Sequence, residues 1–549
     1  MPLRRRVFWS PVLLSFAIAA SGGCNGIFGR DELDFEDAEG HGGGSTASGG
    51  PGGGGGATSC EPESTIACYT GPEQNKGVGN CVLGVQTCAR DGSAYGACVG
   101  DVKPERDEDC RTAGDEDCDG KVCSDALWSA LFGDAGPQLG DAVAVDASGN
   151  VIVATSFAGT FSIGGSELSA ASIELLLAKL GPTGEPIWAK QLNLGSNPRV
   201  GGVVTDARGN IVVGASGDGV LDTGRGAVDA ENLVIKLDPD GEILWARGFG
   251  GRSGFQAPRL AVFGGGQIVV GGRFSSSIPF EKITLTSAGL FDIFLVLLNG
   301  DGVDLQRASY GGAENEWINA LAVDGSSAYI TGYFSGSLAL GSAVHPAPPE
   351  GKSGMFVASV DVVSNTSLRW SKAFYARDLL ATSIAVHPQV GVFLAGTFGE
   401  PMRFDPTVAE ELEPQGSESA YLVKLSTEGA HAFSRRFGDF DALNHSAVAV
   451  DADGHAVLAI EGVGTADFGG DPLSSSGSRD VFLGKLDPLG AHLWSKRFGD
   501  PAIQLLGGIA VGPSNQVALV GAVDGTINFG DRELTSAGDY DLGIAVFAP

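Results

Sequence analysis

The stretch LWSKRFG at residues 493–499, followed by GIAV at residues 508–511, decides the fold of this chain because it recurs. The same elements appear first as LWSALFG at residues 127–133 and AVAVDASGNVIV at residues 142–153. Equivalent starts follow at Trp188, Trp245, Arg307, Trp370 and Ser434. These starts define seven units with a period of about 60 residues, which indicates a repeat architecture.

Each unit contains four runs that are typical of β-strands. The first run is wholly apolar, as at residues 142–145 and 447–450, and a D-x-x-G-N or D-x-D-G turn joins it to the second. The third run, such as residues 481–486, leads through a tight turn to the fourth, which carries the tryptophan. Four antiparallel strands repeated radially make a β-propeller. The sequence therefore predicts a mostly β chain in which residues 126–549 form a seven-bladed β-propeller of four-stranded antiparallel blades.

The two ends of the repeat array complement each other. The last unit stops at its third run, residues 541–547, whereas the array begins with a lone fourth-type run at residues 127–132. We therefore expect the first run to complete the last blade and close the ring.

The repeat resembles the bacterial β-propeller repeat family often called SBBP. The resemblance rests on the elements G-N-V-I-V-x-G, D-x-F-L-x-K-L-D and G-x-x-x-W-S-K-x-F-G, with the best copies at residues 238–250 and 480–499. It implies an extracellular or surface protein without an assigned chemistry, and a fold does not determine an activity.

Residues that recur at fixed repeat positions are expected to serve the architecture. Large apolar side chains at one position should pack between neighbouring blades rather than bind a ligand: Trp128, Trp188, Trp245, Trp370 and Trp494. The aspartates of the D-x-x-G turns should cap their own turns rather than bind calcium: Asp146, Asp206 and Asp451. The lysines of the K-L-D element should offset the acidic turns: Lys179, Lys236, Lys424 and Lys485.

The N-terminal residues 1–23 are typical of a secretory signal, with an arginine-rich start and an apolar stretch too short to span a bilayer. Residues 21–24, SGGC, resemble a bacterial lipobox, although Ser21 stands where that pattern has leucine. The resemblance implies a diacylated Cys24 that holds the exported chain on a membrane.

The alternative is an ordinary signal-peptidase site after Ala19 or Ala20, which leaves Cys24 as a free thiol. With the anchor, we expect a protein at the bacterial cell envelope, at the outer membrane, with its propeller in the periplasm or on the cell surface.

The region after the signal is rich in glycine and serine. Glycine is also abundant in the chain as a whole, at 86 of 549 residues. Residues 24–59 cannot bury apolar surface and are expected to form a flexible Gly/Ser-rich tether.

The formal net charge of the whole chain, −31, repels phosphate backbones, so we expect no nucleic-acid partner.

A cysteine-rich module is expected at residues 60–125. It holds eight cysteines: Cys60, Cys68, Cys81, Cys88, Cys98, Cys110, Cys118 and Cys123. In an exported chain these predict up to four disulfides, whose connectivity the spacing does not reveal. A thiolate metal site is the alternative, but no C-x-x-C pair occurs and the compartment is oxidising.

The module contains DEDCDG at residues 115–120, which places carboxylates at alternate positions before a glycine, as a calcium loop does. Calcium held by Asp115, Asp117 and Asp119 is one hypothesis. A solvated acidic turn between disulfides is the other, because the twelfth position lacks the usual glutamate. With residues 68–81, the stretch resembles the Cys-rich D-x-D-C-D-G segments of bacterial surface proteins, whose family name proposes metal binding.

Catalytic motifs are scarce in the repeat region. Residues 237–245, LDPDGEILW, resemble the tryptophan-docking repeat of quinoprotein dehydrogenases, but those enzymes have eight blades and a vicinal cysteine pair, and no cysteine follows Cys123 here. The seven histidines share no repeat position, and neither HExxH nor a G-x-S-x-G elbow after a strand occurs. We therefore expect a protein that is not an enzyme, with a quinoprotein-like or hydrolytic enzyme as the weakest alternative.

Two connections depart from the repeat, at residues 344–350 and 400–413. Irregular loops of repeat proteins often carry binding sites, although drift in solvent explains them equally well. Acidic residues of the second connection are the expected partner-binding residues: Glu400, Asp405, Glu410, Glu411 and Glu413. We expect a monomeric protein-binding or scaffold propeller with an envelope protein as partner. The alternative is a small-molecule or glycan receptor that uses the central channel.

Overall fold

The computed structural model describes residues 60–105, 115, 118, 126–229, 231–250, 256–280, 283–407 and 411–549. The expected signal segment, Cys24 and the Gly-rich linker lie outside these residues, as do Cys110, Cys123, Asp117, Asp119 and Glu410. Among the described residues the only helix is the 3-10 turn η1 (Glu73–Asn75), and none is long and apolar enough to cross a membrane.

Most strands belong to antiparallel sheets of four, which confirms the expected mostly β chain. Within the described ranges five such sheets are separate, and each places its strands in the order that the repeat predicts. Their strands are β4 (Ala142–Val145), β5 (Val151–Ile163), β6 (Ser166–Leu180) and β7 (Pro186–Leu192); β8 (Arg199–Thr205), β9 (Ile211–Ser216), β12 (Leu233–Leu237) and β13 (Ile243–Gly248); β14 (Arg259–Val262), β15 (Ile268–Phe274), β18 (Asp292–Leu298) and β19 (Asp304–Tyr310); β20 (Glu316–Asp324), β21 (Ser327–Phe334), β24 (Ser353–Asp361) and β25 (Ser367–Ala376); and β35 (Gln504–Val511), β36 (Val517–Val523), β39 (Asp541–Phe547) and β3 (Ala126–Phe132).

The remaining large sheet has nine strands because one long strand runs through two ladders. The first part of β30 (His431–Val450) pairs with β29 and its second part pairs with β31. The other members are β26 (Leu380–His387), β27 (Gly391–Phe398), β28 (Gln415–Gly416), β29 (Glu418–Leu425), β31 (Ala456–Ala466), β32 (Leu473–Ser474), β33 (Asp480–Leu486) and β34 (His492–Phe498). The sheet therefore contains two four-strand ladders that share β30.

Short hairpins fill several connections between second and third strands. They are β10 (Val220–Asp222) with β11 (Ala227–Asp229), β16 (Ser277–Pro279) with β17 (Thr284–Thr286), β22 (Leu338–Leu340) with β23 (Ala343–His345), and β37 (Thr526–Asn528) with β38 (Glu533–Thr535). The connection between β27 and β29 contains no such hairpin, and only the two-residue β28 lies in its described part.

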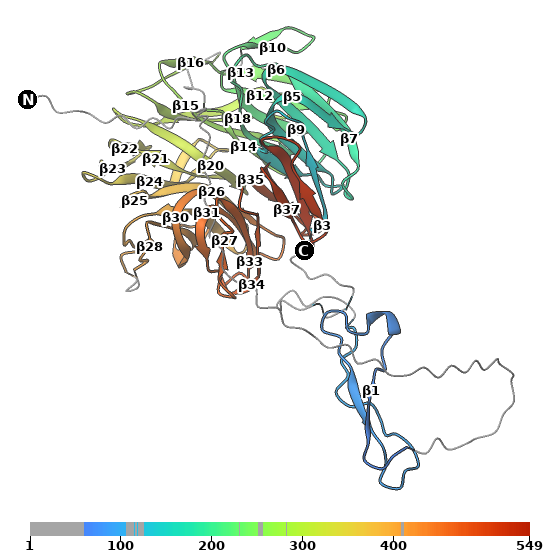
Figure 1. Ribbon diagram of the computed structural model, residues 1–549. Coiled ribbons are helices and arrows are strands. Elements are labelled where there is room, and N and C mark those ends of the chain that lie inside the picture. The colour runs from blue at the N-terminus through green and yellow to red at the C-terminus, as the bar shows by residue number, and fades with distance from the viewer. Residues whose placement is uncertain are drawn as a thin grey trace, which may run out of the picture. The chain divides into compact units, whose positions relative to one another are not determined.

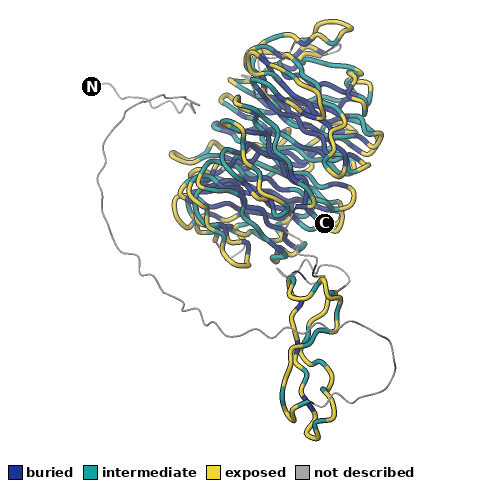
Figure 2. The backbone as a smooth tube through the Cα atoms, turned by 45° about the vertical axis from the view of Figure 1, so that its right-hand side comes forward, coloured by how far each residue is buried: buried dark blue, intermediate teal, exposed yellow. Residues whose placement is uncertain are grey.

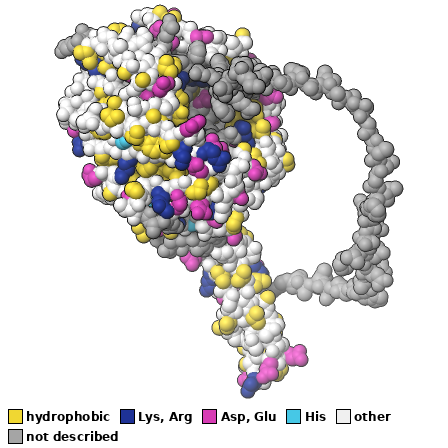
Figure 3. Space-filling model, turned by 90° about the vertical axis from the view of Figure 1, so that its left-hand side faces the viewer, with side chains coloured by type: hydrophobic (Ala, Val, Ile, Leu, Met, Phe, Trp, Pro, Cys, Tyr) yellow, Lys and Arg dark blue, Asp and Glu magenta, His cyan; other side chains and the backbone are white. Residues whose placement is uncertain are grey.

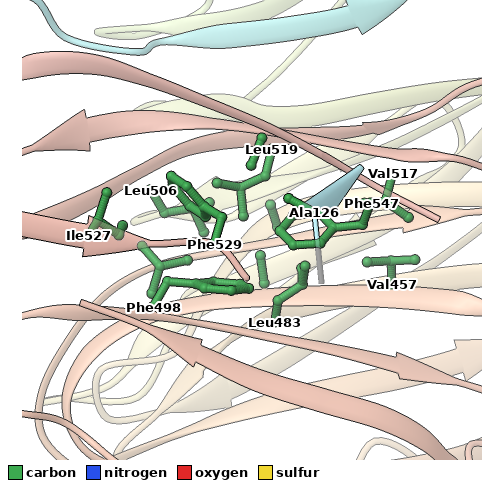
Figure 4. Packing of buried hydrophobic residues seen from close by; sticks show 14 of the residues in the cluster. Ala126, Val457, Leu483, Phe498, Leu506, Val517, Leu519, Ile527, Phe529 and Phe547 are labelled. Carbon is green, nitrogen blue, oxygen red and sulfur yellow. The ribbon is translucent and has the colours of Figure 1, made fainter. Parts of the chain in front are cut away.

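The first strand of the array completes the last sheet, as the repeat ends predict. β3 pairs antiparallel with β39, with Trp128 opposite Val546, and the two lie side by side in Figure 1. The Ser129 N–H and hydroxyl both donate to the Asp531 carboxylate, at 2.9 and 2.5 Å. Figure 4 shows the apolar cluster at this junction, which contains Ala126, Phe547 and Phe498 of the preceding ladder, and the Phe498 and Phe547 ring centres lie 5.3 Å apart. The two ends of the repeat array are thus joined by the backbone hydrogen bonds of β3 with β39 and by a shared apolar cluster.

The sheets are arranged in a ring-like, β-propeller-like array (Figure 1). The first strand of each sheet contacts the first strand of the next, in the cycle β4, β8, β14, β20, β26, β30, β35 and back to β4. Figure 2 shows that burial is greatest along the strands and that exposed residues gather at the turns. This pattern follows from the wholly apolar runs, because each sheet packs against neighbours on both faces.

Polar contacts join neighbouring first strands where each strand bulges. Asn319 and Thr382 are extra residues in their ladders and have no opposite partner in the register. Asn319 Nδ2 donates to the Ala381 carbonyl at 2.9 Å, and Thr382 Oγ1 donates to the Ser446 carbonyl at 2.6 Å. A β-bulge re-aims a side chain out of the ladder, and here it directs polar groups to the next sheet.

The recurring tryptophans lie between neighbouring sheets, as predicted. Trp188 Nε1 donates to the Pro239 carbonyl in the next unit's turn at 3.1 Å, and Lys179 Nζ reaches the same oxygen at 3.3 Å. The indole lies against Gly241, where a Cβ would come within about 3.1 Å of the ring and φ is +79°. Glycine is favoured there for both reasons, because a side chain would collide with the indole and strain the backbone.

The cysteine-rich region forms a small structure of its own, with β1 (Thr65–Cys68) paired to β2 (Gly84–Thr87). Three disulfides join Cys60 to Cys88, Cys68 to Cys98 and Cys81 to Cys118. The expected disulfides are therefore confirmed for six of the eight cysteines.

Candidate functional site

The irregular connection between β27 and β29 is held in place by apolar anchors. Met402 and Leu412 exchange two backbone hydrogen bonds, at 3.0 and 2.9 Å. Met402 and Phe404 are buried, and the Phe404 ring lies 5.0 Å from that of Phe374 and 4.8 Å from that of Tyr421. A loop that had drifted in solvent would not need such anchors, so the described residues 400–407 and 411–417 of this loop are held in place by Met402, Phe404 and Leu412.

Two of the predicted acidic residues are tied into the fold. Glu400 pairs with Lys352 at 2.7 Å, so the two irregular connections are in contact. The hydrogen bond from Lys352 holds the pKa of Glu400 below its usual value. Asp405 accepts the Thr407 hydroxyl at 2.6 Å and its N–H at 2.8 Å, and these bonds lower the pKa of Asp405 in the same way.

The other acidic residues face a groove beside an edge strand. Glu411 and Glu413 are exposed, and Arg403 approaches Glu411 at 3.5 Å. Residues 411–415 and 433–437 line a cavity of about 690 Å³, together with Asp467, Phe468 and Gly469. We call this cavity the rim groove.

The outer strand β30 also lines the rim groove, and its arginines Arg435 and Arg436 were not among the residues that the sequence indicated. The Arg435 guanidinium lies 5.8 Å from the centre of the Phe433 ring, and Arg436 Nη1 donates to the Gly438 carbonyl at 3.0 Å. β28 pairs in parallel with β30 at Asp439 and Phe440, so the loop itself is seated on this strand's edge. The groove therefore offers acidic, basic and aromatic groups on an ordered frame. Charges of both signs are likewise interspersed on the face shown in Figure 3.

The D-x-D-G turn at Asp451 is the second candidate. Among the described residues, Asp451, Asp453 and His455 are the group that could hold a metal ion, with ligand atoms within 4.8 Å of one another. Asp451 Oδ2 already lies 3.1 Å from Lys485 Nζ and 2.9 Å from His455 Nδ1. Burial opposes ionisation of Asp451, yet these partners and the His455 backbone N–H hold its pKa below the usual value. Asp451 is thus already paired with an ammonium group of the chain itself.

The same capping arrangement occurs at the other predicted aspartates. Asp146 Oδ1 accepts the N–H groups of Ser148 and Asn150, at 2.9 and 3.0 Å, and Lys179 Nζ lies 3.1 Å from Oδ2. Asp206 pairs with Lys236 at 3.0 Å. The prediction that these aspartates cap turns and that the lysines offset them is confirmed at these sites.

Lys424 departs from this scheme because His387 replaces the aspartate in its unit. Its ammonium interacts with the Asp487 carboxylate of the next turn, but among the described residues no carboxylate forms a close ion pair with it. It donates to the Pro488 carbonyl at 2.6 Å and lies 5.5 Å from the centre of the Phe393 ring. Desolvation lowers the pKa of Lys424.

The calcium hypothesis for the cysteine-rich region stays open. Asp115 is buried, and its carbonyl accepts the Asn80 N–H at 2.9 Å. Asp117 and Asp119 lie outside the described residues, so the three carboxylates are not brought together here.

No protein-family model and no curated protein matches the chain. Among solved structures the chain is similar to puromycin hydrolase, at 14% identity over 72% of this chain and 54% of that one, with a TM-score of 0.39. It is also similar to Sqt1 of Chaetomium thermophilum, at 10% identity over 77% and 98% of the two chains and a TM-score of 0.37. The endosialidase of phage phi92 gives 9% identity, 77% and 69% coverage and a TM-score of 0.34. The chain spans about half the length of the puromycin hydrolase chain, and likenesses this distant carry no functional argument.

Proposed function

We propose that this protein is an exported, lipid-anchored, seven-bladed β-propeller that acts as a non-enzymatic binding or scaffold module at the cell envelope. The SGGC sequence at residues 21–24 supports the anchor. When the two ladders of the nine-stranded sheet are counted separately, the four-strand units support seven blades. The partner is an envelope protein, bound at the rim groove.

The ordered rim groove is the observation that carries this proposal. Its loop departs from the repeat, yet Met402 and Phe404 fix it by burial, so a partner meets a surface that is already formed. Preorganisation reduces the entropy that binding must overcome. Exposed Glu411 and Glu413 beside Arg435 and Arg436 give the groove charges that can select a partner and orient it.

The test places a photo-crosslinking amino acid at exposed Gln415 of the full-length chain in its own cells. We expect one reproducible envelope protein to be captured, which is then purified and titrated against the protein. Replacing Glu411→Ala and Glu413→Ala together should weaken that binding by about tenfold and reduce its salt dependence.

The matched control removes two acidic residues from regular connections of other sheets, Glu167→Ala and Glu533→Ala. Both residues are exposed, so the change in net charge is the same as in the groove variant. Equal binding by the two variants, or the same captured proteins with the crosslinker at Glu167, would reject the rim groove as the site.

A further inference from the structure

One sheet has only glycines at the tip of the turn between its first and second strands. In the sheet β14-β15-β18-β19, Phe263 takes the place of the turn aspartate and Gly264, Gly265 and Gly266 follow it. The turn keeps the same two backbone hydrogen bonds, from Phe263 N to Gln267 O at 2.9 Å and from Gly266 N to Phe263 O at 2.8 Å. The backbone is therefore unchanged, while every side chain that would project from the tip of the turn is missing.

The missing side chains leave a cavity of about 810 Å³ between this sheet and the preceding one, which we call the glycine pocket. A Cβ added at any of the three glycines would meet no atom within 4 Å. A volume of this size is in the range of small-ligand sites. The pocket is thus open because of its sequence and not because of loose packing.

The walls of the glycine pocket combine an aromatic surface with polar groups. Trp245 and the exposed Leu244 line one side. The Trp245 Nε1 atom donates to the Gly300 carbonyl at 3.1 Å, and a Cβ at Gly302 would come within 2.9 Å of the ring, so the indole is held in a fixed orientation. The indole packs on Gly302, as the indole of Trp188 packs on Gly241, and the part of its ring that lines the pocket can contact the apolar C–H face of a ring-shaped ligand.

The polar groups of the glycine pocket balance in charge. Asp206 and Lys236 form an internal ion pair at 3.0 Å, and exposed Arg208 and Asp301 carry opposite charges. Asn210 and Asn299 add uncharged amides to the lining. In a chain with a net charge of −31, a locally neutral site that offers both donors and acceptors suits a neutral polar ligand better than an ion.

From this geometry we infer that the glycine pocket binds a neutral saccharide ring, with Trp245 as the stacking surface and Arg208 and Asp301 as hydrogen-bonding partners of its hydroxyl groups. This site is separate from the rim groove and does not depend on the function proposed there.

The test is saturation-transfer NMR of the full-length protein with maltose, cellobiose and N,N′-diacetylchitobiose, and with galacturonic acid as a charged probe. We expect at least one neutral disaccharide to give signals from its ring protons. The Gly265→Phe variant fills the pocket at a position with space for the side chain, and it should weaken binding by about tenfold or more. Replacing Arg208→Ala and Asp301→Ala together should act in the same direction.

The matched control is Ser148→Phe, at the equivalent exposed position of the turn between β4 and β5, which should leave binding unchanged. Three outcomes would overturn the inference: no signal from any neutral sugar, equal binding by Gly265→Phe and the native protein, or site-dependent binding of galacturonic acid alone.

Discussion

The turn between the first and second strands is built differently in two neighbouring sheets of this molecule. In the sheet of β8, Asp206 and Lys236 form an ion pair whose side chains are each 4% exposed. In the sheet of β14 the corresponding residues are Phe263 and Leu297, which lie in one apolar cluster. Both turns have the same backbone hydrogen bonds. The same turn backbone can therefore be packed with either a buried ion pair or a pair of apolar side chains. Where the aspartate is replaced by an apolar residue, the lysine that would pair with it is apolar as well.

The largest expected effect comes from breaking the ion pair on one side. Lys236→Met leaves the buried Asp206 carboxylate without its ammonium, and should lower the free energy of unfolding by about 3–5 kcal/mol. Urea unfolding followed by circular dichroism measures the loss. The control is Lys190→Met, because Lys190 pairs with a Glu242 side chain that is 76% exposed, and its loss should be below about 1 kcal/mol. Equal losses in the two variants would contradict the role given to burial.

A second variant tests Glu316, a residue at the start of β20 that differs from the glutamine at the same position in other units. Glu316 begins β20 where other units have Gln138 and Gln504, and in all three the side-chain oxygen accepts the N–H of the residue four positions earlier. Burial raises the pKa of Glu316 to about 7, and the nearby Asp292 adds to this. Because the folded-state pKa lies above the unfolded value, the native protein loses stability as the pH rises from about 4.5 to 7.

Glu316→Gln removes this titration and restores the residue of the other units. We expect the variant to exceed the native protein by about 2–3 kcal/mol in free energy of unfolding at pH 8, with the difference shrinking towards pH 5. Unfolding curves at both pH values measure it, and the reverse change, Gln504→Glu, should destabilise the protein increasingly as the pH rises above about 4.5. A difference that does not vary with pH would show that Glu316 does not titrate in this range.

The smallest effect is expected when the ion pair is converted into the apolar pair. Asp206→Phe with Lys236→Leu copies the turn of the neighbouring sheet, and should leave the protein within about 2 kcal/mol of its native stability, because replacing both partners leaves no buried charge. Thermal and urea unfolding beside the single Lys236→Met variant measure the recovery. A double variant as unstable as the single one would show that the two solutions are not interchangeable.

The repeat made much of the fold predictable. The expected strands at residues 142–145 and 541–547 match β4 and β39, and the pairing of β3 with β39 follows from the complementary ends. The turn aspartates were predictable because their contacts are local. The disulfide pairing was not, because spacing alone permits many connectivities.

Only the acidic loop of the candidate site was predictable from the sequence, because the arginines reach the site through contacts between distant parts of the chain. The acidic loop stands out because it departs from the repeat, but Arg435 and Arg436 lie on a regular strand, and only tertiary packing brings that strand and the loop to the same cavity. Likewise Glu316 and Asp292 belong to adjacent units, and their proximity depends on how the sheets pack. Contacts between units leave no periodic signal in the sequence.

The pairing of β3 with β39 also has a mechanical consequence. Any tension that reaches Ala126 through the preceding residues acts on the first strand of the array, which is joined along its length to the last. The hydrogen bonds of this ladder, and the Ser129 contacts with Asp531, therefore carry the load before any other sheet does. The seam between first and last strands is the molecule's mechanical clamp, and its rupture would be the opening event of unfolding under force.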